Sequence, residues 1–163
     1  MDNARLLLSQ SVSLHDIGST EENMTKTRIS FEFYGGFLAL RILRDTPPSS
    51  STEAAVPQNL AENITEAIIR HQDFRNTGNI TAVGQSLQLA TIDNTCRYAE
   101  VVNPFTIEET TNHHPRQKWS RCFAAGLHRE IELKPWSHTT ALGEGAPARV
   151  LANETMAVQI YCY

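Results

Sequence analysis

The stretch NLAENITEAIIRHQ, residues 59–72, decides the fold class of this 163-residue chain. Its apolar residues recur at positions i, i+4, i+7 and i+8, which places them on one face of an α-helix. The residues on that face are Leu60, Ile64, Ala67 and Ile68. His71 falls on the same face one turn later, so the spacing predicts an amphipathic helix whose last histidine points inward.

Segments on both sides of this stretch have the same period. Residues 6–14 predict the end of a helix that runs into His15 and Asp16, with Gly18 as its stop. Residues 29–44 predict a second helix, and its expected apolar stripe is Ile29, Phe33, Phe37, Leu40 and Leu43. Further helices are predicted over 80–93, over 106–114, where Thr106 and Glu109 fit a capping box, and over 119–134. The chain is therefore expected to be all-α.

The C-terminal region has a different pattern. Residues 143–147, GEGAP, are typical of a linker, and Met156, Val158, Ile160 and Cys162 then alternate as in a strand. We therefore expect a helical domain over 1–142 and an appended tail over 143–163.

Composition and charge exclude several classes of protein. Apolar residues make up 40% and charged residues 20% of the chain, which is typical of one globular domain. Fourteen basic and eighteen acidic residues give a net charge of −4, which argues against a nucleic-acid partner. No run approaches the roughly 18 apolar residues of a membrane span, so no membrane partner is expected.

The cysteines and the first residues indicate a reducing compartment. Cys96, Cys122 and Cys162 are scattered and form no CxxC pair, which is typical of reduced thiols. The opening MDNARLLLSQ lacks the basic and apolar regions of a signal peptide. We therefore expect a cytoplasmic protein, and a homo-oligomer stays open.

Three positions carry residues that suit a metal site in a helical protein. His15 and Asp16 follow a predicted helix end, where the backbone can turn an imidazole and a carboxylate toward one ion. His71 points inward, and Asp93 follows a mostly apolar helix, where a buried carboxylate needs a compensating cation. Each residue alone also fits an ordinary reading: a surface pair, a core histidine or a solvated helix end.

Six groups of residues, read in chain order, resemble one known family. They are LHDIG at 14–18, TRISFEFYGG at 27–36, EAIIRHQD at 66–73, NITAVGQ at 79–85 with LATIDN at 89–94, PRQKW at 115–119 and KPWSHTT at 134–140. Together they resemble the HD-domain metal hydrolases, a family of helical proteins, and within it the cyanamide hydratase-like branch.

The resemblance implies a role for several residues. His15, Asp16 and Asp93 would be ligands of a divalent metal, with zinc expected first and iron as an alternative. His71 would lie beside the metal as the catalytic histidine that binds substrate or shuttles a proton. The implied pocket residues are Thr20, Arg28, Phe31, Tyr34 and His138. The implied reaction is the hydration of a small nitrile-like substrate, cyanamide, to urea.

The chain departs from the family pattern in three places. The family has a further histidine ligand upstream of the His-Asp pair, and no histidine precedes His15 here, which suggests an N-terminally truncated HD domain. One residue, usually aromatic, is missing between Ile92 and Asp93, and one helical residue corresponds to a turn of about 100°. The tail after residue 140 shows no resemblance. Two alternatives to the hydratase therefore stay open: a weakly metal-binding pseudoenzyme, and an HD-type phosphohydrolase.

Overall fold

The computed structural model describes residues 2–45, 56–73, 78–92, 103–115 and 117–156. All regular secondary structure in these ranges is helical, which confirms the all-α prediction. Within the same ranges, no helix has both the length and the apolar character needed to cross a membrane. The chain divides into two compact units, unit 1 over Met1–Gln88 and unit 2 over Leu89–Tyr163.

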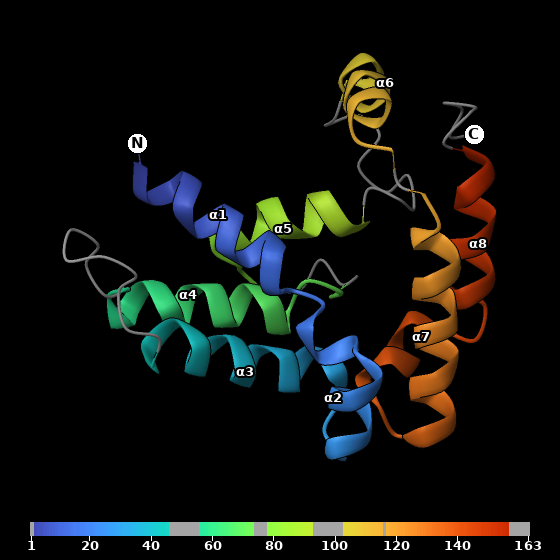
Figure 1. Cartoon of the computed structure of the whole chain (residues 1–163), viewed down its shortest axis with the longest axis horizontal. Helices are drawn as coiled ribbons and strands as arrows, with labels where there is room; N and C mark the ends of the chain where they lie inside the picture. Colours follow the sequence, from blue (N-terminus) through green and yellow to red (C-terminus); the bar gives the residue numbers. More distant parts are fainter. Residues whose placement is uncertain (1, 46–55, 74–77, 93–102, 116, 157–163) are drawn as a thin grey trace. The chain divides into compact units, whose positions relative to one another are not determined.

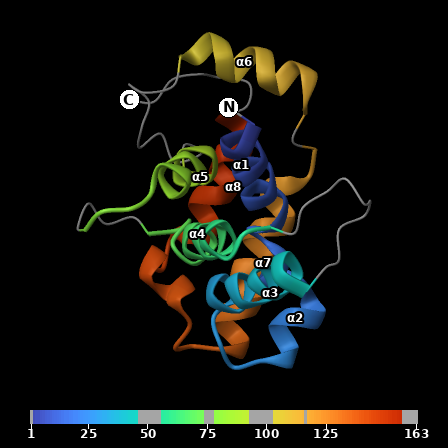
Figure 2. The same ribbon diagram turned by 90° about the vertical axis from the view of Figure 1, so that its left-hand side faces the viewer.

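Unit 1 contains the helices that carry the candidate site. Its elements are α1 (Asp2–Leu14), the 3-10 helix η1 (Ile17–Ser19), α2 (Glu21–Lys26), α3 (Phe31–Asp45), α4 (Gln58–Ile69) and most of α5 (Ala82–Ile92). Helices α3 and α4 run side by side, and α1 packs against α4 (Figures 1 and 2). The short η1 packs against α3, so the segment after α1 is held at the N-terminal part of α3.

The core of unit 1 is made by α3, α4 and α5. Its buried residues are Ala39, Leu43, Ala61, Ile64, Ala67, Ile68 and Leu87. The stripe predicted for residues 59–72 is confirmed, because Ile64 and Ile68 are 0% exposed and His71 is 1% exposed. Truncating one such isoleucine to alanine costs about 2–5 kcal/mol in a typical core. The apolar stripe of α4 therefore fixes the helix that precedes His71.

The apolar stripe predicted for α3 is confirmed at Leu40 and Leu43, which belong to or pack against the core, and is wrong at Ile29 and Phe37. Phe37 is 52% exposed, whereas Gly35, Gly36 and Ala39 face inward. A β-carbon added at Gly36 would lie 2.6 Å from Cγ1 of Ile69, so the absence of a side chain lets α4 approach this closely. The buried face of α3 therefore combines small residues with Phe31 and Leu43.

Unit 2 contains the remaining described helices, α6 (Pro104–His113), α7 (Trp119–Leu133), η3 (His138–Leu142) and α8 (Ala146–Met156). The capping box predicted at Thr106 is wrong. The Asn103 side chain accepts a hydrogen bond from the Phe105 N–H, and Pro104 occupies the first helical position. The helix therefore begins earlier than the sequence pattern predicted.

The start of the predicted tail is helical. Residues 143–147 were interpreted as a linker, but α8 already begins at Ala146 and packs against α7. Gly143 has a φ of +83°, which provides the turn between η3 and α8. Met156 is the last residue of α8, and the rest of the predicted strand lies outside the described residues. The proposed boundary after residue 142 stays a prediction.

A buried charged network joins α7 to η3 within unit 2. The Glu130 carboxylate is fully buried and accepts a hydrogen bond from the Thr139 hydroxyl. Lys134 Nζ lies 3.6 Å from Glu130 Oε1, and its side chain is 3% exposed. Neither charge is solvated, so each depends on the other for compensation.

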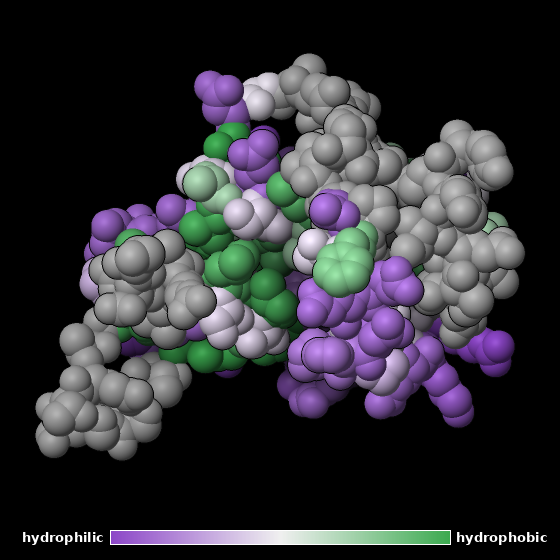
Figure 3. Space-filling view, turned by 90° about the horizontal axis from the view of Figure 1, so that it is seen from above, coloured by the Kyte–Doolittle hydropathy of each residue, from purple (hydrophilic) through white to green (hydrophobic). Residues whose placement is uncertain are grey.

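Apolar side chains also reach the surface of unit 1. Figure 3 shows apolar residues, in green, gathered over the part of the molecule where α1 and α5 lie in Figure 1. On α1, Leu8 is 37% exposed and Val12 is 45% exposed. These two residues lie one helical turn apart, on the turns that precede the His-Asp pair.

Candidate functional site

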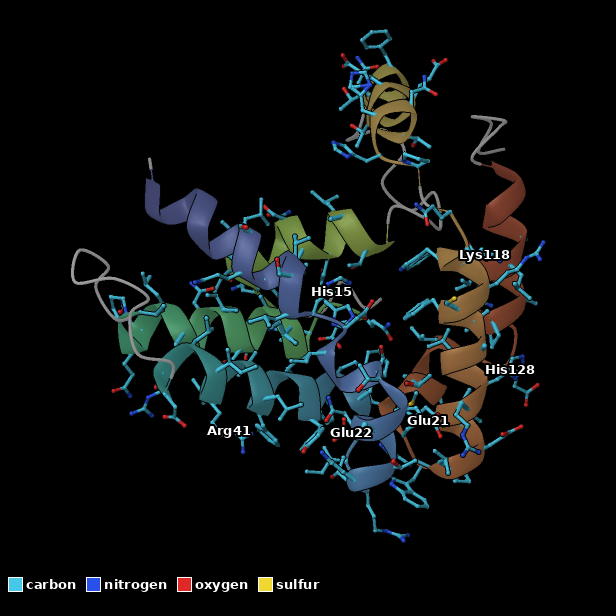
Figure 4. All side chains as sticks on the ribbon, in the orientation of Figure 1. His15, Glu21, Glu22, Arg41, Lys118 and His128 are labelled. Carbon is cyan, nitrogen blue, oxygen red and sulfur yellow. The ribbon has the colours of Figure 1, made fainter. Side chains whose placement is uncertain are left out.

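The His15-Asp16 pair lies in a tight turn between α1 and η1. Helix α1 ends at Leu14, and Asp16 has φ −99° and ψ 9°, outside regular helix geometry. The Asp16 carbonyl accepts hydrogen bonds from the Ser19 N–H at 2.9 Å and from the Ser19 hydroxyl at 2.8 Å. Figure 4 shows His15 where the ribbon leaves α1. Because the turn lies outside both helices, adjacent side chains can face one another.

Gly18 holds this turn against α3 and does not end α1, so its predicted role as a helix stop is wrong. It lies inside η1, and a β-carbon added there would lie 2.0 Å from the Phe31 carbonyl oxygen. A β-carbon added at Gly35 would in turn lie 3.2 Å from the Gly18 nitrogen. The two glycines allow backbone to pack on backbone, which fixes His15 and Asp16 relative to α3.

His15 and Asp16 contact each other directly. His15 Nε2 lies 3.1 Å from Asp16 Oδ2, and His15 Nδ1 lies 2.7 Å from the Val12 carbonyl oxygen. Both partners are acceptors, so both ring nitrogens carry protons in this arrangement. Burial by itself lowers the pKa of His15, but the hydrogen bond and charge of Asp16 outweigh it and raise that pKa. Burial likewise raises the pKa of Asp16, but the His15 contact outweighs it and lowers that pKa.

His71 lies in the turn that follows α4. The helix ends at Ile69 and Arg70 is its C-cap, so the backbone of His71 lies outside the helix. His71 Nδ1 lies 2.6 Å from the Ile68 carbonyl oxygen, which can only accept, so Nδ1 carries the proton of the neutral ring. Burial lowers the pKa of His71 more than the Asp16 charge and the Ile68 carbonyl raise it. The ring is therefore neutral at pH 7, with its proton on Nδ1.

The two histidines and the aspartate converge from different elements. His71 Nε2 lies 3.8 Å from Asp16 Oδ1, too far for a hydrogen bond. The His15 and His71 rings are nearly perpendicular, with centroids 5.3 Å apart. Phe31 packs edge-on against His71 at 6.0 Å, so this predicted pocket residue lies beside the predicted catalytic histidine. Sequence reasoning placed these four residues in one site, and the structure brings them together.

The donor set fits part of a divalent metal site. Asp16 Oδ1 is shielded from solvent and accepts no hydrogen bond from any residue that the structure describes. The His15 Nδ1–H donates to a backbone carbonyl, an arrangement that commonly orients a metal-ligating histidine. Within the described ranges, however, no group of three or more His, Cys, Asp or Glu residues is arranged to hold a metal ion. His15 and Asp16 therefore offer two of the donor groups that a metal site would need.

The other predicted site residues are Asp93, Thr20, Arg28, Tyr34 and His138. Asp93 is outside the described residues. The effect of the residue missing between Ile92 and Asp93 therefore stays a prediction. Thr20 is exposed and caps α2, where its hydroxyl accepts from the Asn23 N–H. Arg28 is exposed and Tyr34 is half-buried on α3. His138 begins η3 in unit 2, and its place in a pocket stays a prediction.

Two residues near the site were missed by the sequence analysis. Glu32 is fully buried on α3, next to Phe31, and its charge acts on His71. Gln88 is buried on α5 and donates to the Arg70 carbonyl. The sequence contained a signal for Glu32. It lies four positions before Gly36, and therefore on the same, inward face of α3. Nothing in the sequence distinguishes Gln88 from the other glutamines of its helix.

The described helices bring a His-Asp pair beside a second, buried histidine, which is the arrangement that the resemblance to HD-domain proteins predicts. Comparison with known proteins finds two relatives. The chain is homologous to two enzymes of Saccharomyces cerevisiae, cyanamide hydratase DDI2 and cyanamide hydratase DDI3, and is 38% identical to each over 141 residues. The match covers 86% of this chain and 60% of each relative. No protein-family model matches the chain.

Proposed function

We propose that this chain catalyses the metal-dependent hydration of cyanamide to urea. The observation that carries the proposal is the convergence of His15, Asp16 and His71, in a chain homologous to cyanamide hydratases. The pair offers the nitrogen and oxygen ligands that suit zinc, and iron is the alternative. The chain spans 60% of its relatives' length, so the substrate is carried over as part of the proposal.

His15 and Asp16 would hold the metal ion, with Asp93 as the third ligand. A bound divalent ion supplies hydroxide near neutral pH by lowering the pKa of water. The His15 Nδ1–H bond to the Val12 carbonyl sets the ring so that Nε2 faces Asp16. Binding at Nε2 requires that this nitrogen release its proton, so metal binding and protonation of His15 compete.

His71 would move the proton that the hydration requires. Attack of hydroxide on the nitrile carbon forms a carbon–oxygen bond, breaks a carbon–nitrogen π bond and leaves negative charge on the nitrile nitrogen, which gains a proton. A second proton then moves from the new hydroxyl group to the same nitrogen, and the product is urea. The neutral His71 ring has an unprotonated Nε2 that can accept a proton from water and return it to that nitrogen. The lowered pKa of His71 keeps the ring in this form near pH 7. Phe31, which packs edge-on against the His71 ring, would form one wall beside the substrate.

A specific observation favours a second candidate, a helical protein that binds metal weakly and catalyses nothing. The described residues provide two ligands rather than a complete set. Each missing ligand leaves a coordination position to water and weakens the hold on the ion. This candidate predicts no urea even when zinc or iron is supplied in excess, whereas the hydratase predicts turnover under the same conditions.

The test is urea formation by the purified chain supplied with cyanamide and zinc or iron. Asp16→Asn preserves side-chain size but removes the ligand charge, so we expect it to abolish turnover. Glu62→Gln is the matched control, because Glu62 is exposed on the outer face of α4. Urea formation that survives Asp16→Asn would show that the metal site is not at the pair. A folded, metal-loaded chain that forms no urea would refute the proposed substrate.

A further inference from the structure

The turn that carries His71 is tied to α5 by a buried side-chain amide. Gln88 Nε2 donates a hydrogen bond of 2.8 Å to the carbonyl oxygen of Arg70. Gln88 is 6% exposed, so water does not readily replace its amide as a donor. Arg70 is the C-cap of α4 and the residue immediately before His71. The Gln88 amide thus holds the backbone of the turn itself.

Other hydrogen bonds hold the same turn from its surface. The Asp73 N–H donates to the Arg70 carbonyl at 3.0 Å, so this oxygen accepts both from its own turn and from α5. The Arg70 guanidinium donates to Asp73 Oδ2 at 3.0 Å and to the Asn79 carbonyl at 2.9 Å. The Arg70 side chain is 26% exposed, whereas the Gln88 contact is shielded. Gln88 is therefore the contact that water competes with least.

The His71 ring follows this backbone closely. Its Nδ1 and its own backbone N–H both approach the Ile68 carbonyl, at 2.6 Å and 3.4 Å. A movement of the Arg70 peptide therefore moves His71 Nε2 relative to Asp16 Oδ1, now 3.8 Å away. Catalytic groups tolerate about 0.5 Å of displacement, and a misplacement of about 1 Å can cost roughly a hundredfold in rate.

We infer that Gln88 is a positioning residue for His71, acting through the Arg70 carbonyl. The hydrogen bond couples the end of α4 to α5, the helix that leads in sequence directly into Asp93. The effect on turnover rests on the proposed hydratase function, whereas the orientation of the His71 ring does not.

The experiment compares Gln88→Met with Gln85→Met in the full chain. Methionine preserves volume but removes the donor, and Gln85 is an exposed glutamine on the same helix. Nitrogen-15 NMR of the metal-free protein reports the tautomer of His71. We expect a single Nδ1–H tautomer in the unmodified chain and in Gln85→Met, and exchange between both tautomers in Gln88→Met. With cyanamide, kcat of Gln88→Met should fall at least about tenfold, while KM changes by less than about threefold.

An unchanged His71 spectrum in a folded Gln88→Met protein would overturn the inference. If this variant does not fold, hydrogen exchange of the side-chain amides in the unmodified chain tests the inference instead. The Gln88 amide protons should exchange at least about tenfold more slowly than those of Gln85, and equal rates would overturn the inference. A tautomer change in a chain that forms no urea supports the role of Gln88 and counts against the hydratase function alone.

Discussion

Gly18 packs its backbone directly onto Phe31, because a β-carbon at Gly18 would lie 2.0 Å from the Phe31 carbonyl oxygen. The contact joins the turn that follows α1 to the first residue of α3. Phe31 in turn packs against His71, so both halves of the candidate site depend on this one close approach. The atom that blocks a side chain is a backbone oxygen inside a helix, which cannot rotate away.

We expect Gly18→Ala to destabilise the chain by about 3 kcal/mol, because the backbone of η1 or α3 must shift to admit the methyl group. Chemical denaturation followed by circular dichroism measures this change. Gly84→Ala is the matched control in the same unit, since its β-carbon would make ordinary contacts at 3.5 Å or more. The control should alter stability by no more than about 1 kcal/mol. Equal stability of the two variants would contradict the close approach.

His15 and His71 should titrate on opposite sides of the ordinary histidine value. The charge and hydrogen bond of Asp16 outweigh burial at His15 and raise its pKa, whereas burial dominates at His71 and lowers its pKa. NMR titration of the ring protons in metal-free protein should therefore give a midpoint above about 6.5 for His15 and below it for His71. Midpoints in the reverse order would refute the arrangement described around Asp16.

The low pKa of His71 should also make the stability of the chain sensitive to acid. The unfolded state binds this proton first as pH falls, so stability is present above about pH 6.5 and is lost below it. His15 acts with the opposite sign, because its pKa is raised in the folded state: its contribution is lost as pH rises through that pKa. We expect His71→Gln to reduce the loss of stability between about pH 7 and pH 5, measured by denaturation at several pH values. An unchanged pH profile would mean that His71 is solvated.

Zinc or iron should bind the chain only weakly. Two ligands from the described residues leave most coordination positions to water, so we expect less than stoichiometric metal after dialysis against a mild chelator. His15→Gln should weaken zinc binding further, by at least about tenfold, in a competition titration with a coloured chelator. His128→Gln, on an exposed position of α7, is the control and should bind zinc as the unmodified chain does. Stoichiometric metal that survives dialysis would contradict this prediction.

The buried network in unit 2 should be costly to break. Glu130→Gln leaves the Lys134 ammonium buried without its carboxylate, and we expect a loss of about 3–5 kcal/mol of stability. Glu132→Gln is the control, because Glu132 is 71% exposed and lies 3.9 Å from Arg129. An exposed pair of this kind contributes roughly 0–1 kcal/mol. Thermal unfolding of both variants measures the difference, and similar transitions would show that Lys134 is solvated.

Much of the helical architecture could be predicted because helix periodicity is a local property. The stripe that ends at His71 was read correctly, since large apolar residues at helical spacing left one face to bury. The buried face of α3 was read only partly correctly, for a physical reason. Gly36 faces α4 and Gly35 packs on Gly18, and burial at both glycines follows from close approach rather than from hydrophobic side chains. The spacing of apolar residues therefore does not reveal a helix face that is buried through glycines.

The sequence by itself determined the candidate residues, because His15, Asp16 and Asp93 follow predicted helices and His71 falls on an inward face. It also determined that helices precede these residues. Only the tertiary structure decided how the histidines meet Asp16: Nδ1 of each histidine donates to a backbone carbonyl, which directs each Nε2 toward Asp16. That orientation depends on helix ends and on contacts such as that of Gln88 with Arg70. Such contacts join segments far apart in the chain, so no local pattern encodes them.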